Sequence, residues 1–579
     1  MKILFFFALV LMFFFASCSN GTNKQQFEHA GGTLSLALQN DPGTYLARDV
    51  TDMFTNSVLS QVMEGLVSFN VNDLKVQPQI ASKWHVSGDG LTYTFELRND
   101  VYFHDNPVFQ SLEDRKLTVE DVVFTIEKAC QPNKKSEPSA AYLFLFRDQL
   151  KGAKAFFEGR AKTITGISIT GNEITLTLIA PNHNFINKIA QTNAAIISKK
   201  VVLAQHENDI VGTGPFMLAQ KSSKTTRKVL LVKNPDYYLT DSKGNALPYL
   251  DSVVFHIQPD QLAQLSLFEK GQIHSINSLP TSKITKMLEG RINDFNAVPP
   301  LMVLYNNPLL FTNFYFFNMS EPRFQDVRVR QAFNYAIDRE KLTQKVLKGQ
   351  FYEAGMFGIV PPIRNFFKGY NFAAVGSVSY GFNPEKARAL LAEAGYPNGE
   401  NFGNVNLRFN ISDVNSQIAD EVATQLFQVL GIHVNIDGSS FERKEKDADF
   451  AKGDIFRTAW AADYSSPETF LSNFYGKFVP SSIKQPSRLN QSRYVNKVFD
   501  YFFEQASKAA TQVDRFKWYA KAEMELMKNP PLMVLWYSND FQLTYSKVRN
   551  LQNNPMSILD LKTVYIKEWT KEAYLKTIH

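Results

Sequence analysis

The chain has 579 residues, of which 44% are apolar and 20% are charged, so neither a disordered chain nor a coiled coil fits. At roughly 150 residues per domain, this length suggests two to four domains. The net charge of +6 arises from 62 basic and 56 acidic residues, with no run of more than two Lys or Arg. We therefore expect a solvated surface and no nucleic-acid partner.

The first residues form a candidate export signal. Met1-Lys2 precede an apolar run over 3–16, and small residues follow it. A fourteen-residue helix rises only about 21 Å, which is too short for a hydrocarbon core of ~30 Å, so a transmembrane anchor is the less favoured alternative. We predict a signal peptide over 1–18 and a flexible polar tether over 19–30.

The two cysteines, Cys18 and Cys130, have different expected roles. The segment Phe15-Ala16-Ser17-Cys18 resembles a bacterial lipobox, whose cysteine carries the lipid anchor of the mature protein. The alternative is an ordinary signal peptide with an incidental cysteine. If Cys18 is lipidated, Cys130 has no partner within the chain and is expected to be a buried small hydrophobe.

The first 260 residues mainly predict strands, because apolar and polar residues alternate with a period of two. Helices are predicted over 53–68 and from 118 to 129, where Thr118 and Asp121 form a capping pair. The predicted strands are 33–38, two strands within 84–103 joined by a turn at 87–90, then 165–170, 173–179, 229–232 and 252–257.

From about residue 320 the pattern becomes helical, with strands between the helices. Such alternation predicts an α/β lobe with a mixed sheet. Early strands, a central α/β block and terminal strands together indicate two lobes whose chain crosses a hinge twice. The predicted helices are 327–347, 384–394, 418–430 and 498–527, and the predicted strands are 405–411, 434–436, 454–461, 532–537 and 541–545.

Sequence signatures of catalysis are largely missing. The chain has no HExxH, no CxxC, no Walker loop and no GxSxG. The segment Gly212-Thr213-Gly214-Pro215 is a lone GxG, and the Ser481–Lys484 SxxK match lies in a Pro/Ser-rich loop. We therefore expect a binding protein rather than an enzyme, with no catalytic residue, metal or cofactor.

Read in chain order, seven or more short motifs resemble the family 5 extracellular solute-binding proteins, which are the peptide-binding subunits of ATP-driven importers. The resemblance spans about 31–566. Its motifs are Met63-Glu64-Gly65-Leu66, the blocks 81–105 and 118–124, Gly212-Thr213-Gly214-Pro215-Phe216, Asn234-Pro235-Asp236-Tyr237-Tyr238, the block 326–339, the block 390–396 and Asn529-Pro530-Pro531.

This resemblance implies an α/β, two-lobed periplasmic-binding-protein fold of type II, in the large three-domain peptide-binding subclass, with mixed sheets and a hinge. Two segments, 108–116 and 241–246, look like loop insertions relative to the family. The implied division assigns 31–70, 198–305 and 526–579 to the main domain of lobe I, 71–197 to a small additional domain, and 306–525 to lobe II.

The resemblance also implies a function. The expected protein is a monomer that captures oligo- or dipeptides between two closing lobes and delivers them to the permease of an ABC transporter. It would reside in the periplasm or at the cell surface, held to the lipid bilayer by acyl chains on Cys18. The alternatives are the same fold binding another solute, such as a nickel chelate, a sugar or a signalling peptide, and more distantly an exported hydrolase.

The strongest site candidate is Asp463, which ends the apolar strand predicted at 454–461. A carboxylate in such a place needs a cation or several hydrogen-bond donors. The resemblance assigns it to the α-ammonium of the ligand, and the alternatives are a helix cap or an internal salt bridge. The neighbouring Tyr464 is included in the expected ligand site.

Four further residues complete the expected site by resemblance. Trp460 would line a side-chain pocket, and the alternative is a place in the core. Arg457 would reach the ligand carboxylate with its planar fork, and the alternative is a surface ion pair. Thr51 and Met53 belong to an extended segment that would pair with the ligand backbone as an added strand.

Overall fold

The structure is a computed structural model. The export signal and Cys18 lie outside the described residues, so their predicted roles stay predictions. The described residues are 24–133, 137–206, 209–277, 279, 284–552 and 554–577.

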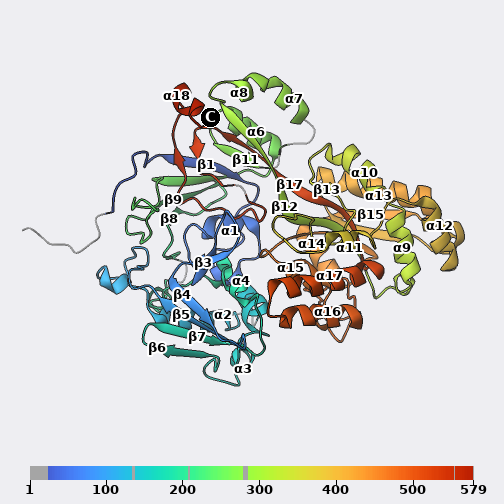
Figure 1. Cartoon of the computed structure of the whole chain (residues 1–579), viewed down its shortest axis with the longest axis horizontal. Helices are drawn as coiled ribbons and strands as arrows, with labels where there is room; N and C mark the ends of the chain where they lie inside the picture. Colours follow the sequence, from blue (N-terminus) through green and yellow to red (C-terminus); the bar gives the residue numbers. More distant parts are fainter. Residues whose placement is uncertain are drawn as a thin grey trace, which may run out of the picture.

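A mixed sheet of eleven strands, counted within these described ranges, extends through both halves of the molecule (Figure 1). Its order is β15-β14-β16-β12-β17-β11-β1-β10-β9-β8, and β13 pairs with β17 beside this path. The strands are β1 (Thr33–Leu38), β8 (Phe216–Gln220), β9 (Lys228–Lys233), β10 (Ser252–Ile257), β11 (Ser275–Asn277), β12 (Met302–Phe317), β13 (Glu353–Ala354), β14 (Val405–Asn410), β15 (Val434–Ser439), β16 (Ile455–Ala461) and β17 (Leu532–Tyr545).

The long strands β12 and β17 join the two halves of this sheet. They are antiparallel, and their pairing runs from Met302 opposite Tyr545 to Phe316 opposite Leu532. The register shifts after Pro308, which lacks the N–H that a regular ladder needs. The two terminal strands predicted at 532–537 and 541–545 are thus one strand, because long-range pairing with β12 carries it through the polar residues between them.

Helices cover both faces of the sheet around β14, β16 and β12. On one face Phe317 packs with Phe333 and Ile418, and on the other Phe316 packs with Phe499 and Leu526. The helices here are α9 (Val327–Tyr335), α10 (Arg339–Leu342), α11 (Phe372–Gly376), α12 (Pro384–Glu393), α13 (Asp413–Leu430), α14 (Phe441–Asp449), α15 (Glu468–Leu471), α16 (Lys497–Lys508) and α17 (Gln512–Lys528).

A separate antiparallel sheet of four strands lies at the lower left of Figure 1. The alternation predicted for its second strand is observed, because Tyr93, Phe95 and Leu97 are buried. Thr118 and Asp121 form the predicted capping box, with a 3.0 Å bond from the Thr118 N–H. The elements are β4 (Ala81–Val86), β5 (Thr92–Leu97), β6 (Ile167–Thr170), β7 (Glu173–Thr177), α2 (Val119–Ala129), α3 (Ala153–Phe157) and α4 (Phe185–Ile189).

The remaining α-helices and β-strands are short and lie before β12 in the chain or in its C-terminal segment. They are α1 (Met53–Leu59), β2 (Val67–Phe69), β3 (Val76–Pro78), α5 (Lys199–Leu203), α6 (Gln261–Glu269), α7 (Ile284–Gly290), α8 (Ile292–Asn296), β18 (Val548–Arg549), β19 (Tyr565–Ile566) and α18 (Lys571–Leu575).

Three predicted helices are shorter than the sequence pattern suggests. The helix expected over 53–68 ends at Leu59, and the chain then enters β2. The helix expected over 327–347 is interrupted after α9, because Asp338 caps the new helix α10. The helix expected over 498–527 is divided into α16 and α17, because Thr511 caps the second one.

The GxG segment packs closely against the backbone near Val62, and its Thr213 binds a buried carboxylate. Glu64 is 2% exposed and accepts hydrogen bonds from Tyr237 Oη at 2.8 Å and from Thr213 Oγ1 at 2.9 Å. A Cβ atom at Gly212 would lie 2.0 Å from the Val62 carbonyl oxygen, and one at Gly214 would lie 2.7 Å from it. The two glycines therefore permit close packing of backbones in the first half of the chain.

The end of the predicted tether packs on the protein. The Gln25 N–H donates to the Gly244 carbonyl at 3.2 Å, within the predicted loop insertion over 241–246, and Phe27 stacks on Tyr249 with ring centroids 4.1 Å apart. A flexible tether therefore does not extend through residue 30. Cys130 is buried as a free thiol, as its sequence context predicts.

Candidate functional site

Asp463 lies two residues beyond β16, in the loop that leads into α15. Its side chain is exposed to solvent, and yet desolvation raises its pKa to about 6. Solvent exposure and desolvation are compatible if water reaches the carboxylate on one side and protein surrounds it on the others. A hydrogen bond from Thr469 and the charge of Lys188 oppose this rise in pKa, and the charge of Glu468 adds to it.

Thr469 connects Asp463 to Trp460. Its buried hydroxyl donates to Asp463 Oδ2 at 3.0 Å and accepts from Trp460 Nε1 at 3.2 Å. It also accepts from the Asp463 backbone N–H at 3.2 Å. The hydroxyl thereby uses its one donor and both acceptor positions, and the carboxylate and the indole are fixed relative to each other.

Residues of the four-stranded-sheet region reach this loop from the other half of the molecule. Lys188 Nζ on α4 lies 3.5 Å from Glu468 Oε1. The Asn184 side-chain amide donates to Glu468 Oε2 and lies 3.4 Å from Ser466 Oγ. Figure 1 shows α4 beside α15 and α17, where the two halves meet.

Arg457 lies on β16 but on the opposite face of the sheet from Trp460. Its cross-strand neighbour is Tyr315, in the core beneath α9 and α13, whereas Trp460 packs on the core beneath α16 and α17. The guanidinium lies 3.2 Å from Asn410 Oδ1 and 3.1 Å from Asn313 Oδ1, and its Nε is buried without a partner. Burial lowers its pKa.

The surface ion pair considered for Arg457 is not found within the described part of the chain, where its partners are amides. The guanidinium therefore keeps one buried N–H without an acceptor among the described residues.

The other predicted residues have different surroundings. Tyr464 is buried, 5% exposed, and its pKa is raised well above the usual value by desolvation. Thr51 is exposed, and Met53 is 60% exposed as the first residue of α1. Asp52 between them is extended and caps α1 through a 2.8 Å bond from the Thr55 N–H, so the extended segment ends before Met53.

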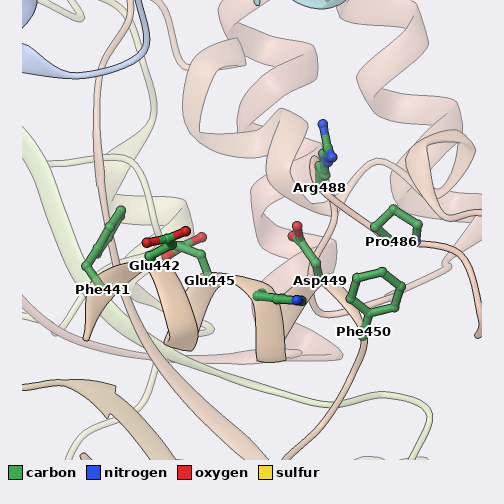
Figure 2. Close-up of a pocket in the computed structure, with 8 residues that line it drawn as sticks. Phe441, Glu442, Glu445, Asp449, Phe450, Pro486 and Arg488 are labelled. Atoms are coloured by element: carbon green, nitrogen blue, oxygen red, sulfur yellow. The ribbon is translucent and has the colours of Figure 1, made fainter. Parts of the chain in front are cut away.

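A separate hollow of about 450 Å³ lies along α14 and contains none of the predicted site residues. Figure 2 shows that Glu442, Glu445 and Asp449 project from one side of this helix, with Pro486 and Arg488 across the hollow. Glu445 and Asp449 both accept from Gln491 Nε2, at 2.8 and 3.1 Å. Glu445 and Asp449 therefore already have a local partner. Asp463 does not line this hollow.

The Asp463 carboxylate accepts a hydrogen bond from a neutral hydroxyl, and no ion pair to it is found among the described residues. Within the same residues, no group of His, Cys, Asp and Glu is placed to hold a metal, and no helix is long and apolar enough to cross a membrane.

The model of the bacterial extracellular solute-binding proteins, family 5, matches residues 75–481. The chain belongs to this family. The two-lobed α/β fold of type II expected from the sequence is confirmed, since the family's solved structures share it. Members of family 5 are solute-binding proteins of the periplasm or the cell exterior.

The relatives of this family 5 chain are remote but cover most of its length. A dipeptide-binding protein of Escherichia coli is 25% identical over 87% of this chain and 88% of its own. Heme-binding protein A of Haemophilus influenzae is 26% identical over 86% of each chain. The structure of DppA from Helicobacter pylori, solved with the peptide STSA, has a TM-score of 0.76 at 25% identity and covers 93% of this chain and 99% of its own.

Sequence reasoning missed Thr469, Glu468, Lys188 and Asn184. Thr469 follows Asp463 by six residues, and a hydroxyl in the first turn after a Pro was the available signal. Lys188 and Asn184 precede Glu468 by about 280 residues, and nothing in their local pattern indicates contact with it. Only the packing of α4 on α15 brings them together.

Proposed function

We propose that this chain is the peptide-binding subunit of an ABC importer and that Asp463 receives the free α-ammonium group of the peptide. The observation that carries this proposal is the state of Asp463. It is a solvent-accessible carboxylate with a raised pKa and no ion-pair partner among the described residues. An ammonium group would supply the missing charge. The dipeptide-binding relative and the peptide-bound DppA support a peptide as the solute.

The other predicted residues take subsidiary roles in this proposal. Trp460 forms a wall next to Asp463, and Tyr464 supports the loop from within. Thr51 offers backbone groups to an extended ligand, and Met53 offers apolar contact. Arg457 receives the carboxylate end of the peptide, because the hydrogen-bond partners of its guanidinium among the described residues are neutral amides.

Further parts of the proposal concern organisation and location. The division into 31–70, 198–305 and 526–579, 71–197, and 306–525 separates lobe I, the small domain and lobe II. The chain crosses between the lobes near residue 305, within β12, and near residue 526, close to the end of α17. The protein is a monomer without enzymatic activity that delivers peptide to a membrane permease. Lipid on Cys18 holds it at the membrane, and Cys18→Ala should release it from the membrane fraction.

The deciding experiment is a calorimetric cycle with Ala-Ala-Ala and N-acetyl-Ala-Ala-Ala against wild type and Asp463→Ala. In this proposal the bound peptide covers the solvent-exposed side of Asp463, so the pair becomes a buried one. Losing one partner of a buried ion pair costs about 3–5 kcal/mol, so either change alone should weaken binding roughly 100- to 1000-fold. The two changes together should add little, because they remove the same contact. Equal affinity of wild type for both peptides would reject the amine site.

Haem is the competing solute, because a relative of similar identity is a heme-binding protein. Titration with haemin, followed by its absorption spectrum, distinguishes the two. Tight haemin binding that survives Asp463→Ala, without peptide binding, would replace the peptide proposal.

A further inference from the structure

Lys188 is a cation within electrostatic range of Asp463, but its ammonium is paired with another carboxylate. Its ammonium lies 3.5 Å from Glu468, and the side chains are only 15% and 10% exposed. The Asn184 amide donates to the other carboxylate oxygen of Glu468. Glu468 thus holds α4 of the small domain against the loop that carries Asp463.

The three charges interact with one another. Lys188 lowers the pKa of Asp463, and Glu468 raises it, so both lie within electrostatic range of that carboxylate. Among these three groups, two carboxylates and one ammonium leave a single negative charge; the Arg515 guanidinium also lies within electrostatic range of Glu468, whereas Lys188 and Glu468 are the charges that shift the pKa of Asp463. Because Lys188 and Glu468 neutralise each other, this charge remains at Asp463, where one α-ammonium would balance it.

We propose that Glu468 is a positioning residue of the amine site, which keeps Lys188 away from Asp463 so that Asp463 remains available to the ammonium group of the solute. This inference rests on the proposed function. Without Glu468, the ammonium of Lys188 would be poorly compensated in a low-exposure environment, and Asp463 is a carboxylate within its electrostatic range. An unpaired charge in such a place is costly, so the lysine would pair with Asp463 and compete with the ligand.

The sequence position of Glu468 agrees with this role. Glu468 is the first residue of α15 and lies between Asp463 and Thr469, so the same short segment carries the amine acceptor, its hydroxyl partner and the residue that retains Lys188. The lysine comes from the other half of the molecule. The pair therefore also joins the small domain to lobe II when the two are together.

The test uses Glu468→Gln, Lys188→Met and the double variant, with calorimetry on Ala-Ala-Ala and its N-acetyl form. Glu468→Gln keeps the size of the side chain and one oxygen for Asn184. We expect it to weaken Ala-Ala-Ala binding about tenfold or more, since a buried charge loses its partner and is redirected to Asp463. The double variant should recover to within about threefold of wild type, because the competing lysine is gone.

Recovery on removing Lys188 is a result that a merely structural role of Glu468 would not give. The matched control is Lys83→Met with Glu96→Gln, an exposed pair of the same small domain with a 2.7 Å separation. Its variants should bind Ala-Ala-Ala as wild type does. Thermal unfolding of every variant confirms that each is folded, and Glu468→Asp offers a second variant that keeps the charge and should bind more tightly than Glu468→Gln.

The outcomes separate this inference from the proposed function. If wild type binds free and acetylated peptide equally, the amine site itself is wrong. If wild type prefers the free amine but Glu468→Gln binds as tightly as wild type, the positioning role is wrong. The same conclusion follows if the double variant remains as weak as Glu468→Gln.

Discussion

Thr469 Oγ1 donates a 3.0 Å hydrogen bond to Asp463 Oδ2 and, through the same oxygen, accepts the indole N–H of Trp460. This bond favours the charged form of the carboxylate and opposes the rise in its pKa caused by desolvation. Thr469 therefore influences the charge state of Asp463 and the position of Trp460.

Thr469→Val should raise the pKa of Asp463 further and free the Trp460 ring. We expect roughly a tenfold or greater loss of Ala-Ala-Ala affinity near pH 6.5, since one hydrogen bond to a charged group contributes about 1.5 kcal/mol or more. Thr469→Ser keeps the hydroxyl and is the control. Calorimetry on both variants checks this, and equal affinities of the Val and Ser variants would contradict it.

Peptide affinity should depend on pH through two groups. The pKa of Asp463 is about 6, so lowering the pH below that value neutralises the carboxylate and weakens binding. A peptide α-amino group has a pKa of about 8, so its positive charge is lost above that pH. Affinity for Ala-Ala-Ala should therefore be highest between these values.

Asp463→Asn supplies the control for this dependence. Its weaker binding should lack the loss on the acid side, because an amide does not titrate in this range. Titrations at pH 5, 7 and 9 check the profile, and an acid-side loss that persists in Asp463→Asn would assign it to another group.

Glu523 on α17 should make the stability of the protein depend on pH. It is fully buried, accepts from Tyr370 Oη at 2.6 Å and from the Val360 N–H at 2.7 Å, and burial raises its pKa to about 7. An unfolded chain loses this proton near pH 4.3, so the folded state binds more protons from there to about pH 7. Stability should fall across that window as the pH rises.

The expected loss is on the order of 3 kcal/mol between pH 4.5 and 7, and Glu523→Gln should remove this slope. Thermal unfolding of wild type and Glu523→Gln at several pH values measures it. A slope of the same size in both proteins would show that Glu523 does not cause it.

Leu74, between β2 and β3, combines burial with a strained backbone. It is 2% exposed with φ of 58°, in the left-handed region that disfavours side chains. Among the described residues, it is the only member of the core beneath α16 and α17 that precedes residue 310. It therefore packs the first part of the chain against the core of lobe II.

Leu74→Ala should destabilise the protein by about 2–5 kcal/mol, because it empties a core position. Leu74→Gly loses the same contacts but relieves a backbone cost of about 1 kcal/mol, so it should be the more stable of the two. Urea unfolding of both variants checks this order, which is the reverse of the usual one for Ala and Gly. Greater stability of the Ala variant would contradict the strain.

Local features of the molecule could be predicted because their causes are local. Alternating residues in β5 place Tyr93 and Phe95 in the core, and a Thr118–Asp121 pair starts α2 wherever that segment packs. Ordered motifs along the chain indicated the family and hence the fold. Asp463 was identified as a candidate from its place at the end of an apolar strand and from the resemblance of its segment to the amine site of family 5 proteins.

Contacts between distant segments were decided only by the tertiary structure. The polar residues between 537 and 541 predict a break between two strands, yet pairing with β12 makes β17 one continuous strand. Arg457 and Trp460 are three residues apart, and only the burial of each sheet face shows which core each one joins. Lys188 meets Glu468 because two lobes pack together, and local pattern carries no information about that choice of partner, since any lysine on a helix satisfies the same periodicity.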